Sequence, residues 1–420
     1  MTTAVHPAQK RILGVLVSAQ ILSGAGLAAG ITVGALLAQD MLGSTSLSGL
    51  PSALFTVGSA AAAILVGRTS QRLGRRAGLA AGYAAGAAGS LGVVVAAAVG
   101  SAFLLFLALF VYGAGTATNL QARYAGADLA SPSHRGRAVS TVLVATTVGA
   151  VAGPNLVTAT GRLAESLDIP RLAGPFILAA FAYAAAGAVL WIMLRPDPLT
   201  TARALAANGP ESGETASQQR ATHPRSGTNA HLMLGAAVMV LTQLVMVAIM
   251  TMTPVHMQHH GHDVSAAGLV IAVHVAGMYL PSPFSGLLVD RFGKLTVAAA
   301  SGVTLLAAGL LAALAPPQSV GLLALALALL GLGWNFGLLS GTAIITDTVP
   351  LATRAKTQGT VDVAIALAGA GGGMASGFVV AASSYTLLAI IGGALALAII
   401  PAVAYIARPW PPTFGAGSGP

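Results

Sequence analysis

The chain contains no cysteine among its 420 residues. This absence excludes a disulfide framework, an iron–sulfur cluster and a thiolate metal site. Charged residues are also scarce, at 7%, whereas a soluble domain carries roughly a quarter. No nucleophile paired with a base and no phosphate-binding loop stands out, so the sequence does not indicate an enzyme, and we expect no permanently bound cofactor. Because 55% of the residues are apolar, most of the chain must lie in lipid.

Most of the chain consists of long apolar runs. Each membrane-spanning helix needs about 20 apolar residues, and a segment in lipid must satisfy its own backbone polar groups. We therefore predict an all-α membrane protein. Its twelve transmembrane helices are expected near residues 12–38, 47–66, 77–98, 101–124, 138–160, 172–195, 230–255, 264–285, 295–315, 319–344, 358–380 and 384–407.

The net charge of +9 follows the predicted topology and does not indicate a nucleic-acid partner. Of the 20 lysines and arginines, only Arg162 and Arg171 lie on the opposite side of the membrane from the others. Because basic residues collect on the cytoplasmic side, we expect a multi-pass protein of the bacterial inner membrane with both termini cytoplasmic. The first helix is too long for the apolar region of a signal peptide, so we expect it to be retained. The expected partners are the lipid bilayer and a small solute, and the expected state is a monomer.

A ten-residue pattern occurs twice, 219 residues apart, starting at Gly67 and at Gly286. Other recurrences at this offset are Asp128 with Asp347, Arg135 with Arg354, Arg137 with Lys356, and Gly153 with Gly372. These recurrences indicate a tandem duplication. The segment 197–229, rich in Pro, Gly, Ser and Thr, is typical of a flexible cytoplasmic linker. We predict two pseudo-symmetric six-helix bundles, at 1–196 and 230–420, a plan that secondary transporters use.

The repeated pattern has the form Gly-x-x-x-Asp-Arg-x-Gly-Arg/Lys and follows the second and eighth spans. It resembles motif A of the major facilitator superfamily (MFS), and the twelve spans and central linker extend the resemblance over the whole chain. The resemblance implies an alternating-access transporter whose gating residues here are Gly67, Gln71, Arg72, Gly74, Arg75, Gly286, Asp290, Arg291, Gly293 and Lys294. Gln71 stands where the family has aspartate, which predicts a weaker latch in the first half. The alternative is a basic loop that only fixes topology.

The segment from Gly149 to Pro154 in the fifth span resembles motif C, which in this superfamily marks proton-coupled exporters. Small residues spaced by four also serve close helix packing, so that alternative stays open. Leu109 stands where such exporters have an arginine. The carboxylate nearest the middle of a span is Asp362, a candidate for proton coupling because buried carboxylates act as proton relays.

Methionine and histidine gather in one region, because seven of the eleven methionines and six of the nine histidines fall between His231 and Met278. Met246 and Met250 on span seven are spaced i, i+4 and share a helix face, as do His274 and Met278 on span eight. Counted at about 1.5 Å per residue, Met246 and His274 both lie roughly 15 Å from the outer helix ends. Three thioethers and one imidazole form a soft, uncharged ligand set that suits Cu(I). The structural alternative is methionine as apolar filler and a histidine bonded to a carbonyl.

This arrangement resembles the paired motifs Met-x-x-x-Met and His-x-x-x-Met of the CcoA-type copper importers, a branch of the same superfamily. The resemblance implies copper uptake through Met246, Met250, His274 and Met278, although relatives of that branch carry other substrates, riboflavin among them. A polar loop between the two helices, on the predicted outer face, is a candidate collector of metal ions, with an inert loop as the alternative. It contains His256, Met257, His259, His260, His262 and Asp263.

Four further polar residues at membrane depth are candidates for lining the central cavity or for hydrogen bonds between helices: Asn119, Gln121, Trp334 and Asn335. Together these patterns predict a secondary transporter that works by alternating access and imports Cu(I). The first alternative is a proton-coupled exporter of drugs or small metabolites. The second is a non-transporting membrane sensor with the histidine-rich loop as its detector.

Overall fold

The computed structural model describes residues 6–42, 50–208 and 225–407, and every regular element in those ranges is helical. This confirms the all-α prediction. Ten segments within these ranges are long and apolar enough to cross a membrane. Helices α1 (Gln9–Leu42) and α5 (Arg135–Glu165) fill the remaining two of the twelve predicted positions.

The other helices follow the predicted spans closely in position. In the first half they are α2 (Leu50–Leu73), α3 (Arg75–Ala98), α4 (Ala102–Ala127) and α6 (Gly174–Met193), with short 3-10 turns η1 (Pro132–His134) and η2 (Arg171–Ala173). In the second half they are α9 (Arg225–His259), α10 (Val264–Tyr279), α11 (Ser282–Phe292), α12 (Lys294–Leu314), α13 (Val320–Thr348), α14 (Arg354–Ala382), α15 (Tyr385–Ala396) and α16 (Ile399–Ala407).

Two of the predicted spans are each built from two helices. The eighth span is divided between α10 and α11 beside Pro281, which has no backbone N–H to continue a helix. The twelfth is divided between α15 and α16 near Leu397, an interruption that the sequence pattern did not predict. Pro254, by contrast, lies inside α9, which continues to His259.

The segment expected to be a flexible linker begins as a helix. Helix α7 (Pro198–Ala207) forms because the side chain of Asp197 accepts hydrogen bonds from the first backbone N–H groups of the helix. Proline directly after the capping residue also favours a helix start. The predicted linker residues 209–224 lie outside the described ranges.

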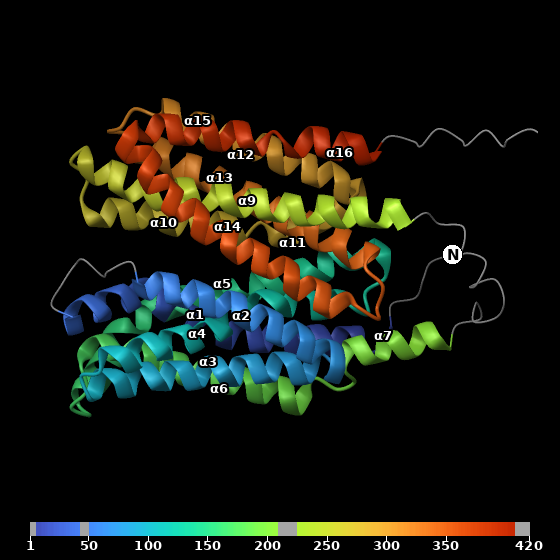
Figure 1. Cartoon of the computed structure of the whole chain (residues 1–420), viewed down its shortest axis with the longest axis horizontal. Helices are drawn as coiled ribbons and strands as arrows, with labels where there is room; N and C mark the ends of the chain where they lie inside the picture. The colour runs from blue at the N-terminus through green and yellow to red at the C-terminus, as the bar shows by residue number, and fades with distance from the viewer. Residues whose placement is uncertain (1–5, 43–49, 209–224, 408–420) are drawn as a thin grey trace, which may run out of the picture.

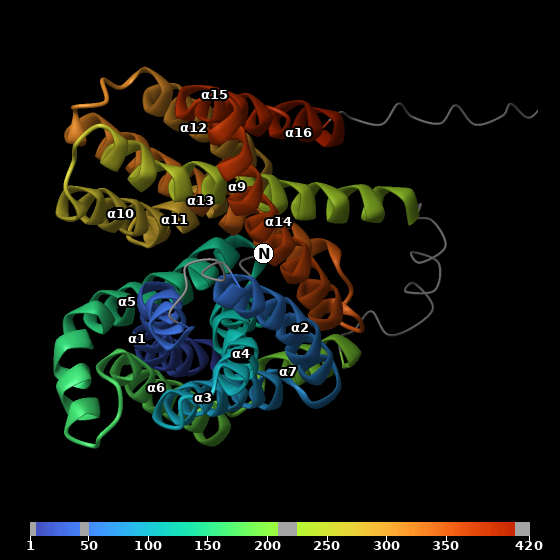
Figure 2. The ribbon, with the colours of Figure 1, turned by 60° about the vertical axis from the view of Figure 1, so that its left-hand side comes forward.

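The helices form two groups, α1–α6 and α9–α16, which face each other along their length (Figures 1 and 2). Helix α14 leans from the second group onto α2, and α5 packs on α11 of the second group. The buried apolar residues form two main clusters. One, around Tyr83 and Tyr183, lies in the first group, and the other, around Trp334, lies mostly in the second group but includes Val139 and Leu143 of α5. We call the end of the molecule that carries α7 and the turns after α2 and α11 the linker end. The opposite end, which carries the loop between α9 and α10, is the far end.

Candidate gate and transport site

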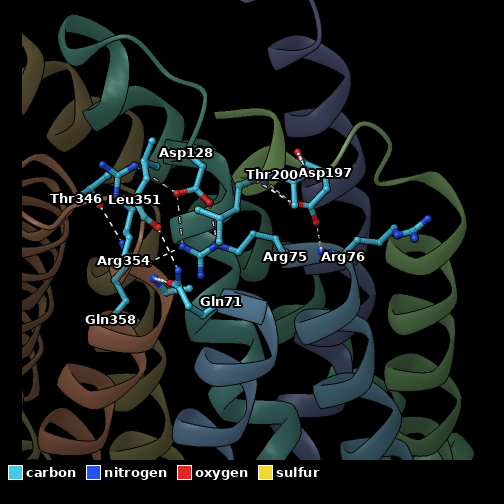
Figure 3. Close-up of polar contacts among 12 residues, drawn as sticks. Gln71, Arg75, Arg76, Asp128, Asp197, Thr200, Thr346, Leu351, Arg354 and Gln358 are labelled. Carbon is cyan, nitrogen blue, oxygen red and sulfur yellow. Dashed lines mark hydrogen bonds and ion pairs between the residues drawn. The ribbon is translucent and has the colours of Figure 1, made fainter. Parts of the chain in front are cut away.

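Gln71, in the last turn of α2, joins the first half to the second at the linker end (Figure 3). Its Oε1 accepts hydrogen bonds from the backbone N–H groups of Ala355 at 2.8 Å and Lys356 at 3.3 Å, at the start of α14. Its Nε2 donates to the carbonyls of Leu351 at 3.2 Å and Ala352 at 2.6 Å. An aspartate would accept the first two bonds but donate neither of the others. The amide therefore compensates for its missing charge with two additional hydrogen bonds.

Beside Gln71, a buried ion pair continues the contact between the halves. Arg75 Nε lies 2.8 Å from Asp128 Oδ2, and neither side chain is exposed. Arg75 also donates to Gln358 of α14, while Arg354 Nη1 lies 3.9 Å from Asp128 Oδ1. The carboxylate of Asp128 thus lies between cations from both halves. We call Gln71, Arg75, Asp128, Arg354 and Gln358 the first latch.

The second copy of the pattern makes the corresponding contact in the opposite direction. Asp290, near the end of α11, accepts hydrogen bonds from the backbone N–H groups of Gly136 at 2.7 Å and Arg137 at 3.1 Å, at the start of α5. Arg137 Nε lies 3.1 Å from the same carboxylate. A negative charge at a helix N-terminus is favoured by the helix dipole. Asp290 therefore caps a helix of the first half, as Gln71 caps a helix of the second.

Lys294 and Asp347 are more exposed to solvent than Arg75 and Asp128, which occupy the corresponding positions of the first half. Asp347 pairs with both Lys294 and Arg135, and these three side chains are 26%, 29% and 17% exposed, respectively. A cavity of about 260 Å³ lies among them and Asp290. Burial and, second, the Arg354 guanidinium lower the pKa of Arg135, which precedes the predicted span. We call Asp290, Lys294, Asp347, Arg135 and Arg137 the second latch.

Glycines allow both latches to form. Gly67 lies so close to α14 that a Cβ there would be 2.8 Å from a carbonyl oxygen, and at Gly286 a Cβ would be 2.6 Å from a carbonyl oxygen of α5. Gly74 and Gly293 have φ angles of 93° and 89°, in the left-handed region that favours glycine. The four motif glycines therefore serve close approach and tight turns.

Two motif arginines stay outside the latches, while the linker supplies a contact that the sequence analysis missed. Arg72 and Arg291 are both exposed. Arg203 of α7 donates from Nε to the carbonyl of Leu351 at 3.3 Å, and this carbonyl also accepts from Gln71. The linker helix is therefore part of the closure at the linker end.

A second buried ion pair joins the halves deeper in the molecule. Arg123 Nη2 on α4 lies 2.7 Å from Asp362 Oδ1 on α14, and Tyr124 contacts the same oxygen at 3.2 Å. Arg123 also donates to Thr342, its own counterpart in the repeat, at 3.0 Å. Asp362 Oδ2 is buried without a hydrogen-bond partner among the described residues. Leu143 occupies the position that corresponds to Asp362, so the other repeat cannot form this pair.

The methionine and histidine set lies inside the second half. Met246 and Met278 are buried in one apolar cluster, and Met250 packs against it. His274 is also buried, and its Nδ1 donates to the carbonyl of Leu327 at 2.9 Å. Its Nε2 is buried and has no hydrogen-bond partner in the described part of the chain. The imidazole is therefore held in the tautomer that leaves Nε2 as an acceptor, which metal ligation requires.

The residues expected to collect metal at the far end do not act as one group. Met257 is fully buried in the core of the second half. Asp263 caps α10, and His262 Nε2 donates to a carbonyl in the loop after α12 at 2.7 Å. The rings of His256 and His260, however, lie together, with centroids 4.4 Å apart.

All four polar candidates at membrane depth form hydrogen bonds between helices. Asn119 donates to a serine of α1 at 2.8 Å, and Gln121 donates to a carbonyl of α2 at 2.8 Å. Trp334 donates to Gln243 of α9 at 2.7 Å, and Asn335 donates to a carbonyl of α10 at 2.7 Å. These contacts support the interhelical interpretation, because buried polar groups in lipid need such partners.

The motif C segment also has a packing role where it is described. A Cβ at Gly149 would lie 2.1 Å from the carbonyl oxygen of Ile21 in α1, so close packing requires glycine there. Leu109, which replaces the exporter arginine, is buried in the core of the first half. The side chains of 150–155 lie outside the described residues.

Comparison with known proteins identifies the family of the chain. The Major Facilitator Superfamily model matches residues 16–263 and 232–418. The chain is 60% identical, over 94% of its length and 92% of the relative's, to the uncharacterized MFS-type transporter YdeG of Bacillus subtilis strain 168. It is 32% identical, over 84% of its length and 85% of the relative's, to the riboflavin transporter RfnT of Brucella anthropi.

A solved structure supports the fold independently. The human organic anion transporter MFSD10 matches with a TM-score of 0.73 over 95% of this chain and 100% of that chain, at 17% identity. That likeness concerns the fold alone, whereas the family model and the relatives cover nearly the whole sequence. The chain therefore belongs to the major facilitator superfamily of membrane transporters.

Proposed function

We propose that the chain is a secondary transporter that works by alternating access in the bacterial cytoplasmic membrane, with its linker end in the cytoplasm. The observation that carries the proposal is that each copy of the repeated loop caps a helix of the opposite half, at the same end. A solute can pass between the halves at that end only after these contacts break. The described conformation then corresponds to a carrier closed toward the cytoplasm.

The first candidate cargo is Cu(I), moving inward. It is supported by the buried Nε2 of His274, which lacks a partner among the described residues, and by the thioethers of Met246 and Met278 in the same half. Neutral thioether and imidazole ligands suit a soft monovalent ion and suit Mg²⁺ or Mn²⁺ poorly. Removing one such ligand would leave the ion undercoordinated in an apolar site.

The second candidate cargo is a planar organic solute. It is favoured by the relation to a riboflavin transporter over most of both chains. It is also favoured by two aromatic rings of the second half, because Tyr279 and Trp334 meet edge to face with centroids 5.8 Å apart. Gln243, which accepts the indole N–H, adds a polar group beside these rings. Aromatic faces and a few fixed polar groups are what ring-shaped ligands bind.

Uptake measurements separate the two cargoes. Cells expressing the wild type, Met246→Leu or His274→Leu would be given radioactive copper under reducing conditions and, separately, radioactive riboflavin. The copper proposal expects both variants to lose most copper accumulation, since leucine keeps the apolar volume but removes the ligand. Met252→Leu is the matched control, because Met252 packs against the same cluster but lies outside the ligand set.

Each outcome favours one interpretation. Equal copper accumulation in wild type, Met246→Leu and His274→Leu cells, at matched protein levels in the membrane, would reject the copper site. Riboflavin accumulation above that of cells without the gene would support the organic solute. If neither solute accumulates faster than in cells without the gene, both cargo proposals fail while membership of the superfamily stands.

A further inference from the structure

The far end of α9 carries two imidazole rings in contact. His256 and His260 are spaced i, i+4 at the end of the helix, so both rings lie on the same side. Their centroids are 4.4 Å apart and the ring planes make an angle of 52°. A metal–imidazole bond is about 2.0–2.1 Å, so two nitrogens bound to one ion lie at most about 4.2 Å apart. Rings whose centres lie 4.4 Å apart can bring one nitrogen each within that distance, because a nitrogen lies at the edge of its ring and not at its centre.

Each ring is held in place by a neighbour that leaves nitrogen atoms for a ligand. His260 Nδ1 lies 2.8 Å from the carbonyl oxygen of His256, and because a carbonyl only accepts, Nδ1 carries the proton. The Nε2 of His260 is then an unprotonated acceptor. His256 contacts Tyr385 face to face, with centroids 4.4 Å apart and an interplanar angle of 18°. Face contacts of this kind fix a ring without using the nitrogens at its edge.

Tyr385 is itself fixed, which makes the arrangement preorganised. Its hydroxyl lies 2.8 Å from Thr253 Oγ1, and that hydroxyl donates to a carbonyl within α9 at 2.8 Å. The Tyr385 side chain is therefore the donor toward Thr253. Neighbours that orient a ligating histidine matter because changing them typically costs about 10–100-fold in metal affinity.

We propose that His256 and His260 form a binding site for a divalent transition metal ion at the far end, distinct from the buried set around His274. Two imidazoles favour ions such as Cu²⁺, Ni²⁺ or Zn²⁺ over Mg²⁺ and Ca²⁺, which prefer oxygen. No three His, Asp or Glu side chains of the described residues are grouped closely enough to enclose a metal ion. The proposed site therefore has two side-chain ligands, and water would complete the coordination. The proposal does not depend on which solute crosses the membrane.

Cu²⁺ bound to the purified full-length protein in detergent tests the site by electron paramagnetic resonance, which detects coordinating nitrogens directly. The wild type is expected to show a signal with two imidazole nitrogens. His256→Phe keeps a flat ring against Tyr385 but has no nitrogen, so it separates metal binding from ring packing. His260→Ala removes the other ligand. Both variants are expected to lose the two-nitrogen signal.

Two controls make the result specific. His259→Ala changes an exposed histidine between the two ligands in sequence, and His274→Leu changes the buried imidazole; both are expected to keep the signal. A two-nitrogen signal that survives in His256→Phe, or that is lost in His259→Ala, would overturn the proposal. Absence of bound Cu²⁺ in the wild type would overturn it as well. Loss of copper uptake in His274→Leu with an intact signal would leave the two sites independent.

Discussion

The first latch meets the start of α14 with an amide, Gln71, whereas the second meets the start of α5 with a carboxylate, Asp290. Both side chains accept hydrogen bonds from two successive backbone N–H groups of the opposite half. The ion pair of Asp128 in the first latch is fully buried, while that of Asp347 in the second is partly exposed beside a cavity. The two latches therefore share this capping contact and differ in how far solvent reaches their ion pairs. One latch depends on a desolvated ion pair, the other on charges that solvent can screen.

The largest expected difference between the latches concerns their ion pairs. Asp128→Asn leaves the buried Arg75 charge without its partner, which typically costs about 3–5 kcal/mol of stability. Asp347→Asn makes the same change where solvent screens the charges, so the expected cost is only about 0.2–1 kcal/mol. Thermal unfolding of both purified variants in detergent, followed by tryptophan fluorescence, measures the contrast. Similar destabilisation of the two would show that burial does not distinguish them.

The pair between Arg123 and Asp362 sharpens the comparison, because the first repeat has Leu143 at the corresponding position. Asp362→Asn keeps the shape but leaves Arg123 with no opposite charge. We expect the closed form at the linker end to lose about 2–3 kcal/mol relative to the open form, somewhat less than for complete loss of a buried partner. The native chain has no cysteine, so a single cysteine would be introduced into α14 near the linker end. Labelling of this cysteine should be faster in Asp362→Asn than in the parent that carries the cysteine alone.

The double variant Arg123→Gln with Asp362→Asn is the control for this expectation. It removes both charges, and a neutral pair of similar shape leaves no uncompensated charge in the interior. Labelling should return close to the rate of the parent carrying only the introduced cysteine. If the double variant labels as fast as Asp362→Asn alone, the contact between the halves does not depend on charge pairing.

The smallest expected effect is the salt dependence of the second latch. Raising salt from about 0.15 M to about 1 M shortens the Debye length from about 8 Å to about 3 Å, which weakens exposed charges more than buried ones. Asp290→Asn removes the partner of Arg137, whose side chain is 51% exposed to solvent, and with it a charge at the start of α5 that is worth about 0.3–1 kcal/mol. Salt should therefore speed cysteine labelling at the linker end less in Asp290→Asn than in the parent.

Gln71→Ala is the matched control in the first latch, because it removes a capping side chain without removing a charge, so the salt response should equal that of the parent. A salt response that disappears in Gln71→Ala but persists in Asp290→Asn would show that the salt dependence comes from the first latch and not from the second.

The candidate site was predictable only in part. The 219-residue offset locates both copies of the gating pattern, because a duplicated loop keeps its residues. The pattern suggests that Gln71 weakens the first copy, yet its four hydrogen bonds depend on donors and acceptors that the other half supplies. The collector loop was also predictable only in part: Met257 is buried in the core, while the rings of His256 and His260 contact each other. Side-chain direction at a helix end depends on the neighbouring helices.

The amino-acid sequence by itself determined the membrane environment, the helical class, the positions of the spans and the internal duplication. These follow from the length and apolarity of single segments, because lipid forces each segment to satisfy its own backbone. Only the tertiary structure decided that Arg123 pairs with Asp362, that Arg203 of the linker joins the first latch, and that His274 donates to the carbonyl of Leu327. Each of these contacts joins residues far apart in the chain, and their energy depends on burial, which no local pattern encodes.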